Sequence, residues 1–226
     1  MKSKSRNIIT IDGTSSSGKT TISKILAKKL KFNLLDSGKL YRSIGFIASE
    51  TSQSLDKINN LDELISNMSL ITNSDTYEYE IYYENKKIDH LLYDEYVGKA
   101  ASIVSKIPKV RKSMLDIQHS CASSNNLIAN GRDMGSKVFP NANLKIYINA
   151  SLDVRAKRRF DELVQKGESV KFDEVFESLK NRDESDMNRA ISPLKIPNNA
   201  HIIDTSNLKP DAIVDKILNL YTITEN

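Results

Sequence analysis

Hydrophobic residues recur along this 226-residue chain in two patterns, short apolar runs and longer stretches with helical spacing. The runs predict strands at residues 8–11, 32–35, 127–129, 144–150 and 200–204. Helical spacing predicts helices between them, at about residues 22–30, 40–47, 96–124, 154–166, 172–189 and 212–221. Strands separated by helices predict an α/β fold with a central parallel sheet, which binds ligands at the carboxyl ends of its strands.

One segment departs from this pattern. Residues Tyr77 to Tyr83, YEYEIYY, alternate with a period of two, and Asn85-Lys86-Lys87 offers a turn before Ile88. After a polar, helix-leaning stretch at 51–68, we expect a small antiparallel β insertion of about 35 residues. Its tyrosines either cover a small core or stack on a base, and covering a core is the commoner role for such a hairpin face.

Composition sets broad limits on function. The chain has 33 basic and 29 acidic residues, a formal net charge of +4, which suits an anionic ligand but lacks the long basic runs typical of nucleic-acid binding. The single cysteine, Cys121, has no second cysteine to pair with, and the three histidines are far apart in sequence. No apolar run is long enough for a signal peptide or membrane span. We expect a soluble, cytoplasmic protein that binds neither nucleic acid nor membrane.

The stretch IDGTSSSGKT, residues 11–20, contains the candidate donor site. Gly13 to Thr20 fits G-x-x-x-x-G-K-[ST] between a predicted strand and a predicted helix, the context that this phosphate loop requires. Small residues let backbone N–H groups approach phosphate oxygens, Lys19 can neutralise the β- and γ-phosphates, and the Thr20 hydroxyl can ligand Mg²⁺. We expect ATP to be bound by Gly13, Thr14, Ser15, Ser16, Ser17, Gly18, Lys19, Thr20 and Thr21, with Thr20 as the metal ligand.

Other motifs narrow the class of phosphate-loop protein. No aspartate is followed by glycine three residues later, and the only Asn-Lys pair, Asn85-Lys86, lacks the aspartate that would read guanine, so a GTPase is disfavoured. A small kinase fits better, and it needs a second substrate. Arginines near loops and helix ends suit an anionic acceptor, because a guanidinium binds phosphate oxygens in pairs. Arg182, Asp186 and Arg189 fall on one helix face, although a surface ion-pair ladder would also give this spacing.

Five motifs together resemble those of the bacterial cytidylate (CMP) kinases, members of the nucleoside-monophosphate kinase family of P-loop kinases. They are IDGTSSSGKT, LLDSGKLYR, NGRDMGSKVFP, RAKRR and NRDESDMNR…SPL, in the family's order and spacing across essentially the whole chain. The resemblance implies a three-layer α/β/α P-loop kinase fold with a central parallel sheet. It also implies one domain over residues 1–226, with an antiparallel β insertion for binding the monophosphate at about 61–100 and a short helical lid at about 154–189.

The resemblance also implies roles for individual residues. The CMP phosphate would be bound by Arg42, Arg132 and Arg189, the base by Ser37, Ser102, Arg111 and Asp133, and the sugar by Arg182 and Asp186. The lid arginines Arg155, Arg158 and Arg159 would close over the ATP phosphates. The catalytic set would be Lys19, Arg132, Asp133, Arg158 and Arg189. A carboxylate at 133 can accept from the exocyclic amine of cytosine, where uracil presents an oxygen instead.

The implied reaction is reversible transfer of the ATP γ-phosphoryl group to CMP or dCMP by a monomer. It needs no general base, because the acceptor oxygen is already an anion. Catalysis would then consist of positioning the substrates and neutralising charge on the phosphates. Two departures stand out: Thr14 and Ser16 replace a proline and a glycine of the family's loop, and Asn130 replaces an acidic residue, which weakens the expected Mg²⁺ affinity. The rivals are a kinase of another small substrate on the same core and a nucleotide-regulated RNA-binding protein.

Overall fold

The computed structural model describes residues 6–123 and 125–225 of the chain. Its strands are β1 (Ile8–Gly13), β2 (Asn33–Asp36), β3 (Met68–Thr72), β4 (Tyr79–Tyr83), β5 (Lys86–Lys87), β6 (Leu127–Gly131), β7 (Leu144–Asn149) and β8 (His201–Asp204). Its α-helices are α1 (Lys19–Leu30), α2 (Ser37–Glu50), α3 (Leu61–Ser66), α4 (Glu95–Val104), α5 (Pro108–Cys121), α6 (Leu152–Gln165), α7 (Phe172–Asn188) and α8 (Pro210–Glu225). A 3₁₀ helix at Asp89–Tyr93 and a π-helix at Met134–Val138 complete the order.

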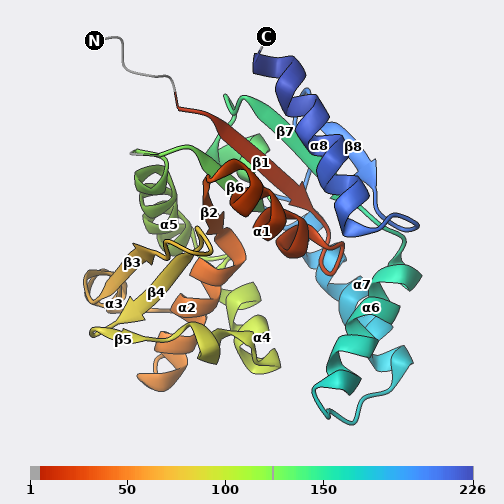
Figure 1. Ribbon diagram of the computed structural model, residues 1–226. Helices are drawn as coiled ribbons and strands as arrows, with labels where there is room; N and C mark the ends of the chain where they lie inside the picture. The colour runs from red at the N-terminus through yellow and green to blue at the C-terminus, as the bar shows by residue number, and fades with distance from the viewer. Residues whose placement is uncertain (1–5, 124, 226) are drawn as a thin grey trace, which may run out of the picture. The chain divides into compact units, whose positions relative to one another are not determined.

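The strands form two sheets (Figure 1). The larger has the order β2-β6-β1-β7-β8, and the smaller has the order β3-β4-β5. In the larger sheet β1 pairs in parallel with β7, with Gly13 opposite Ile148, and β7 pairs in parallel with β8. In the smaller sheet β3 and β4 are antiparallel, with Leu70 opposite Ile81. The predicted α/β/α fold with a parallel sheet and an antiparallel insertion is confirmed.

By the contacts within it, the chain forms two compact units. Unit 2 consists of Ile8–Leu26 and Asn130–Asn226. Its core is built from strand residues with no exposed surface, such as Ile11 and Ile146, and from Val214 and Ile217 of α8. Helices α6 and α7 pack side by side around their own apolar cluster, which includes Ala156, Leu163, Val175 and Leu179.

Unit 1 consists of Ala27–Ala129 and the N-terminal residues up to Asn7. Helix α2 packs along α4, and the close approach of the two backbones leaves no room for a side chain at Gly45: a Cβ there would lie 2.9 Å from the Cβ of Ala100. The three-stranded sheet joins β2 through one parallel bridge between Leu34 and Glu78. The tyrosine-rich strand therefore belongs to a small core, with Ile81 buried at its centre.

The structure corrects or refines three local predictions. The helical stretch expected at about 96–124 contains two helices, because Pro108 begins α5 after a break at residues 105–107; Ser124 lies outside the described residues. The hairpin turn falls on Glu84 and Asn85, both with positive φ, so that Lys86 and Lys87 form β5 rather than the turn. The polar stretch at 51–68 contains only one short helix, and β3 follows it directly.

Within the ranges 6–123 and 125–225, no helix has the length and apolar character needed to cross a membrane.

Candidate functional site

The loop between β1 and α1 has a backbone that only certain residues can adopt. Gly13 has φ +149°, and a Cβ at this position would lie 1.9 Å from the carbonyl oxygen of Ile148 on the neighbouring strand β7. Gly18 has φ +90°, and a Cβ there would meet only Ile22 Cδ1, at 3.8 Å; Ser16 adopts φ +58° although it has a side chain. The glycines at both ends of the motif are thus required by geometry, one by a close approach and one by its backbone angle.

Lys19 lies buried at the start of α1 and turns back onto its own loop. Its Nζ donates to the carbonyl oxygen of Thr14 and, at 3.3 Å, to the hydroxyl of Ser17. Ser17 is held in turn, because its Oγ donates to Thr14 O at 3.0 Å and its carbonyl accepts from the Thr205 hydroxyl at 3.0 Å. A preformed loop with an ammonium at its centre is suited to binding an anion.

The predicted metal ligand, Thr20, has an amide rather than a carboxylate beside it. The Nδ2 of Asn130, a residue 2% exposed at the end of β6, donates to Thr20 Oγ1 at 3.1 Å. Thr21, the last residue assigned to ATP, is exposed on the first turn of α1. In the part of the chain that the structure describes, no group of three or more histidine, cysteine, aspartate or glutamate side chains is arranged to hold a metal ion.

Asp12, to which the sequence motifs gave no role, ties the end of β1 to the π-helix that follows β6. Its two carboxylate oxygens accept from the backbone N–H groups of Met134 at 2.8 Å and Gly135 at 2.7 Å. Burial raises the pKa of Asp12 from 3.8 to about 6, more than these two hydrogen bonds lower it. The π-helix that begins at Met134 is thereby fixed to the end of β1, and Arg132 and Asp133 immediately precede it.

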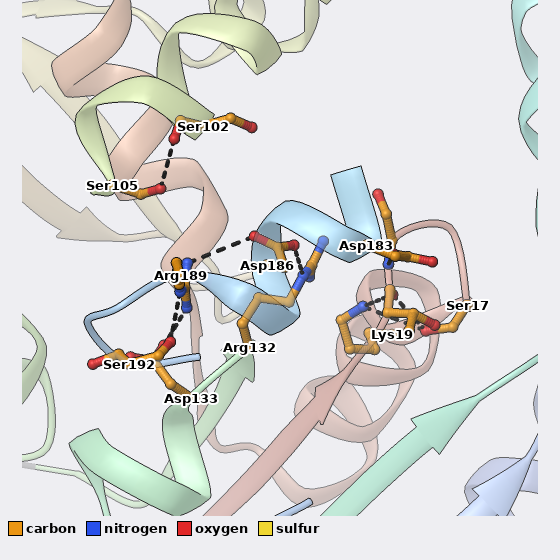
Figure 2. Close-up of polar contacts among 12 residues, drawn as sticks. Ser17, Lys19, Ser102, Ser105, Arg132, Asp133, Asp183, Asp186, Arg189 and Ser192 are labelled. Atoms are coloured by element: carbon orange, nitrogen blue, oxygen red, sulfur yellow. Dashed lines mark hydrogen bonds and ion pairs between the residues drawn. The ribbon is translucent and has the colours of Figure 1, made fainter. Parts of the chain in front are cut away.

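Two predicted phosphate ligands converge on one carboxylate in unit 2 (Figure 2). Arg132 Nε donates to Asp186 Oδ2 at 2.8 Å, and Arg189 Nη1 lies 3.6 Å from Asp186 Oδ1. Arg189 also lies 3.9 Å from Asp133, which is 2% exposed, and donates from Nε to Ser192 O at 2.6 Å. We call Arg132, Asp133, Asp186 and Arg189 the arginine cluster.

The electrostatic surroundings of the arginine cluster favour the ionised form of Asp186. Burial opposes ionisation of Asp186, but the nearby guanidinium of Arg132, followed by those of Arg182 and Arg189, outweighs it and holds the pKa of Asp186 below its usual value. Asp186 is therefore an ionised carboxylate that positions two guanidinium groups. Arg182, the remaining residue assigned to the sugar, contributes to this field from one turn earlier on α7.

The three predicted lid arginines lie in different surroundings on α6. Arg155 is buried, donates to Ala150 O at 3.0 Å and Ser15 O at 3.2 Å, and pairs with Asp183 at 2.6 Å. Arg158 donates to Thr205 O at 2.6 Å. Arg159 pairs with Glu162 on the surface of its own helix. Arg155 and Arg158 thus face residues that themselves contact the phosphate loop.

The other predicted substrate residues belong to unit 1. Ser37, at the start of α2, accepts from Gln118 at 2.8 Å, and Arg42 donates to Leu92 O at 2.7 Å. Ser102 donates to Gly98 O on α4. Arg111 donates to Ser105 O at 3.2 Å and lies 5.5 Å from the centre of the Tyr41 ring. Each arginine is thus oriented by a backbone carbonyl.

Sequence reasoning missed four polar residues that organise these groups: Asp12, Gln118, Asp183 and Thr205. Each is buried, and each contacts a residue more than 80 positions away in the sequence. The separation is greatest for Thr205, which contacts a residue 188 positions away. The only sequence signal for Asp12 was its place immediately before Gly13, the first glycine of the phosphate loop. Asp183 lies within the motif NRDESDMNR, which gave it no role of its own. Gln118 and Thr205 lie outside the motifs, and the partners of all three come together only in the folded chain.

Comparison with known proteins gives one consistent family. A family model described as cytidylate kinase matches residues 9–223. The cytidylate kinase of Marinomonas sp. (strain MWYL1) is 40% identical over 211 residues, which cover 93% of this chain and 93% of that protein. The cytidylate kinase of Vibrio cholerae serotype O1 (strain ATCC 39315 / El Tor Inaba N16961) is 38% identical over 211 residues, covering 93% and 94%.

Among solved structures, a gluconokinase from Sinorhizobium meliloti 1021 aligns over 98% of this chain and 97% of its own. The TM-score is 0.51 and the sequence identity 13%, a likeness of fold alone.

Proposed function

Because this chain belongs to the cytidylate kinase family, we propose that it catalyses reversible transfer of the ATP γ-phosphoryl group to CMP or dCMP, giving ADP and CDP or dCDP. The observation that carries the proposal is the arginine cluster, in which Arg132 and Arg189 are both held on the ionised carboxylate of Asp186. Two oriented guanidinium groups suit the dianionic phosphate of a monophosphate acceptor.

The donor, in this proposal, is ATP in the phosphate loop. The loop residues Gly13 to Thr20 would bind its phosphates through backbone N–H groups, and Lys19 would leave Thr14 O to neutralise the transferring charge. Arg158 and Arg159 on α6 would contribute cations as the lid closes and water is excluded. Arg155 differs from these two, because its guanidinium already faces the loop backbone.

The residues present suit Mg²⁺ when the substrate phosphates supply the negative charge. Thr20 Oγ1 and the Asn130 side-chain oxygen are hard, neutral ligands of the kind that Mg²⁺ accepts alongside phosphate oxygens and water. Thr20 would hold the ion directly, and Asn130 would hold a water bound to it. The ion would neutralise charge on the transferring phosphoryl group.

Residues proposed for the acceptor are given for each unit by itself. In unit 1, Arg42 would bind the phosphate, while Ser37, Ser102 and Arg111 would line the base. In unit 2, Asp133 would accept from the exocyclic amine of cytosine, and Arg182 and Asp186 would contact the sugar. A uracil oxygen opposite Asp133 would set acceptor against acceptor, which favours CMP over UMP.

The test is ADP formation from Mg·ATP with CMP, dCMP, UMP, AMP, GMP or dTMP offered singly. We expect strong turnover with CMP and dCMP and weak turnover with UMP. Preference for another monophosphate would leave a kinase but remove the base assignments. No turnover with any of the six would contradict the proposal.

A matched pair of variants tests the donor site in the same assay. Lys19→Ala removes the loop cation, and turnover is expected to fall by about 100-fold or more, the usual effect of removing one group that stabilises transition-state charge. Lys28→Ala removes an exposed lysine from the same helix and should leave turnover unchanged. Turnover of Lys19→Ala within a few-fold of the parent would contradict the donor assignment. A monomeric, cytoplasmic enzyme remains a prediction.

A further inference from the structure

A buried ion pair joins the two helices of the predicted lid to the phosphate loop. Arg155 of α6 and Asp183 of α7 lie with Nη1 and Oδ2 2.6 Å apart, and they are 5% and 7% exposed. Both also contact the backbone of Ser15. Arg155 Nη1 lies 3.2 Å from Ser15 O, and the Ser15 N–H points at Asp183 Oδ1 at 3.5 Å. The pair therefore contacts both backbone polar groups of Ser15.

The two contacts differ in strength. The Arg155 contact is of ordinary length and is supported by a second hydrogen bond from Nε to Ala150 O at 3.0 Å. The Asp183 contact is at the long limit for a hydrogen bond, so little is lost when it breaks. The N–H groups of a phosphate loop bind phosphate oxygens, and a carboxylate oxygen is likewise an anionic hydrogen-bond acceptor.

The apolar packing of α6 and α7 makes the pair part of a stiff unit. Leu179 lies one turn before Asp183 on α7, Ala156 follows Arg155 on α6, and both belong to the apolar cluster between the helices. One turn after Asp183, Asp186 holds Arg132 of the arginine cluster. Asp183 and the arginine cluster are therefore neighbours on the same helix.

We propose that Asp183 occupies the Ser15 N–H in the nucleotide-free protein and yields it to a donor phosphate, while Arg155 stays on Ser15 O as the hinge contact of the lid. Arg155 and Asp183 are then positioning residues rather than ATP ligands. This inference rests on the proposed function of the loop as the ATP site.

The sign of the effect on nucleotide affinity distinguishes this role from a merely structural one. Asp183→Asn removes the competing carboxylate and leaves the Arg155 cation beside the loop, so ADP and inorganic pyrophosphate should bind about three- to tenfold more tightly. Arg155→Gln leaves the Asp183 carboxylate unpaired beside the loop, so both should bind at least about tenfold more weakly. The double variant should return close to the parent affinity.

Isothermal titration with ADP and with pyrophosphate measures these affinities without an acceptor substrate. Asp161→Asn is the matched control, since it removes a carboxylate from an exposed pair on α6 and should change neither affinity. Weaker binding in both single variants, or equal affinities throughout, would overturn the inference while leaving the proposed function intact. A parent protein that binds neither ligand would overturn both.

A second measurement uses the unaltered protein and does not depend on a variant's folding. On titration with ADP, the Ser15 amide resonance and the Asp183 carboxyl carbon resonance should shift together with one midpoint, as the N–H changes acceptor. A Ser15 shift without any change at the Asp183 carboxyl would overturn the proposal.

Discussion

At the scale of single residues, two side chains of the phosphate-binding region depart from the pattern expected for it. Ser16 adopts φ +58°, the left-handed region, where an L-residue carries a cost that glycine does not. Asn130 supplies an amide next to Thr20 where the family resemblance led us to expect an acid. The loop thus contains a serine in a strained backbone conformation. The side chain beside Thr20 makes a hydrogen bond to the Thr20 hydroxyl but carries no charge.

Ser16→Gly should raise the free energy of unfolding by about 0.5–1 kcal/mol, because relief of the left-handed strain exceeds the entropy that glycine adds to the unfolded chain. Urea denaturation measures the change. Ser169→Gly, in an exposed loop without positive φ, is the control and should be neutral or slightly destabilising. Equal effects of the two substitutions would contradict the strain argument.

Asn130→Asp should introduce a negative charge beside Thr20. The Mg²⁺ concentration for half-maximal ATP-dependent turnover should fall about three- to tenfold, as expected for one added charge near a partly screened cation. Asn126→Asp, just before the opposite end of β6, keeps its acceptor role toward the Asn7 N–H and serves as the control. An unchanged Mg²⁺ requirement in Asn130→Asp would show that the amide already performs the acid's role.

At the scale of elements, β1 and β7 together determine where the phosphate loop begins. The parallel register places Gly13 opposite Ile148, so the first loop residue lies against the backbone of the next strand. At the other end of the loop, α1 begins at Lys19, directly after Gly18. Packing against β7 therefore constrains the loop at Gly13, and the positive backbone angle φ constrains it at Gly18.

A pair of glycine substitutions separates these two constraints. Gly13→Ala places a methyl group against Ile148 O and should destabilise the protein by about 3 kcal/mol or more, with loss of ADP binding. Gly18→Ala meets only Ile22 Cδ1, at an ordinary contact distance of 3.8 Å, and should cost only about 1–2 kcal/mol, from its φ of +90°. Thermal melting with and without ADP measures both, and a milder effect at Gly13 than at Gly18 would contradict the packing argument.

The strands and helices of the larger sheet could be predicted because each carries a local signal, an apolar run or helical spacing. The break before Pro108 also had a signal, since proline is favoured in the first turn of a helix. Strand β3 had none, because its exposed and half-buried residues follow a polar stretch without a distinct pattern. The contacts of Asp12, Asp183 and Thr205 depend on distant segments meeting, so no single stretch of sequence contains them.

At the scale of the whole molecule, stability depends on a buried carboxyl. Folded Asp12 keeps its proton up to about pH 6, whereas the unfolded chain releases it near 3.8. Between these values the folded state binds more protons, so this group makes the free energy of unfolding fall as pH rises, by about 3 kcal/mol in total. The contribution of Asp186 to the free energy of unfolding rises with pH instead, because the pKa of Asp186 is lowered in the folded state.

Comparison with Asp12→Asn isolates the Asp12 contribution, since Asp186 is common to both proteins. The stability of the parent relative to the variant should decline by about 3 kcal/mol from pH 3.5 to pH 7, most of it between pH 4 and 6. Urea denaturation at intervals of half a pH unit measures it. A difference that does not vary with pH would mean that Asp12 titrates alike in both states.

The pairing of β1 with β7 has a consequence for how the protein is made. The nucleotide loop follows β1 near the start of the chain, but the strand against which Gly13 packs ends at Asn149 of 226 residues. A ribosome must therefore release about two-thirds of the chain before the loop has its neighbour, and nascent chains stalled ahead of β7 should not be retained on an ATP resin. Unit 1, whose central segment is continuous from Ala27 to Ala129, is translated almost entirely before that point. The phosphate loop is thus synthesised well before β7, and it acquires its neighbouring strand only after β7 has been made.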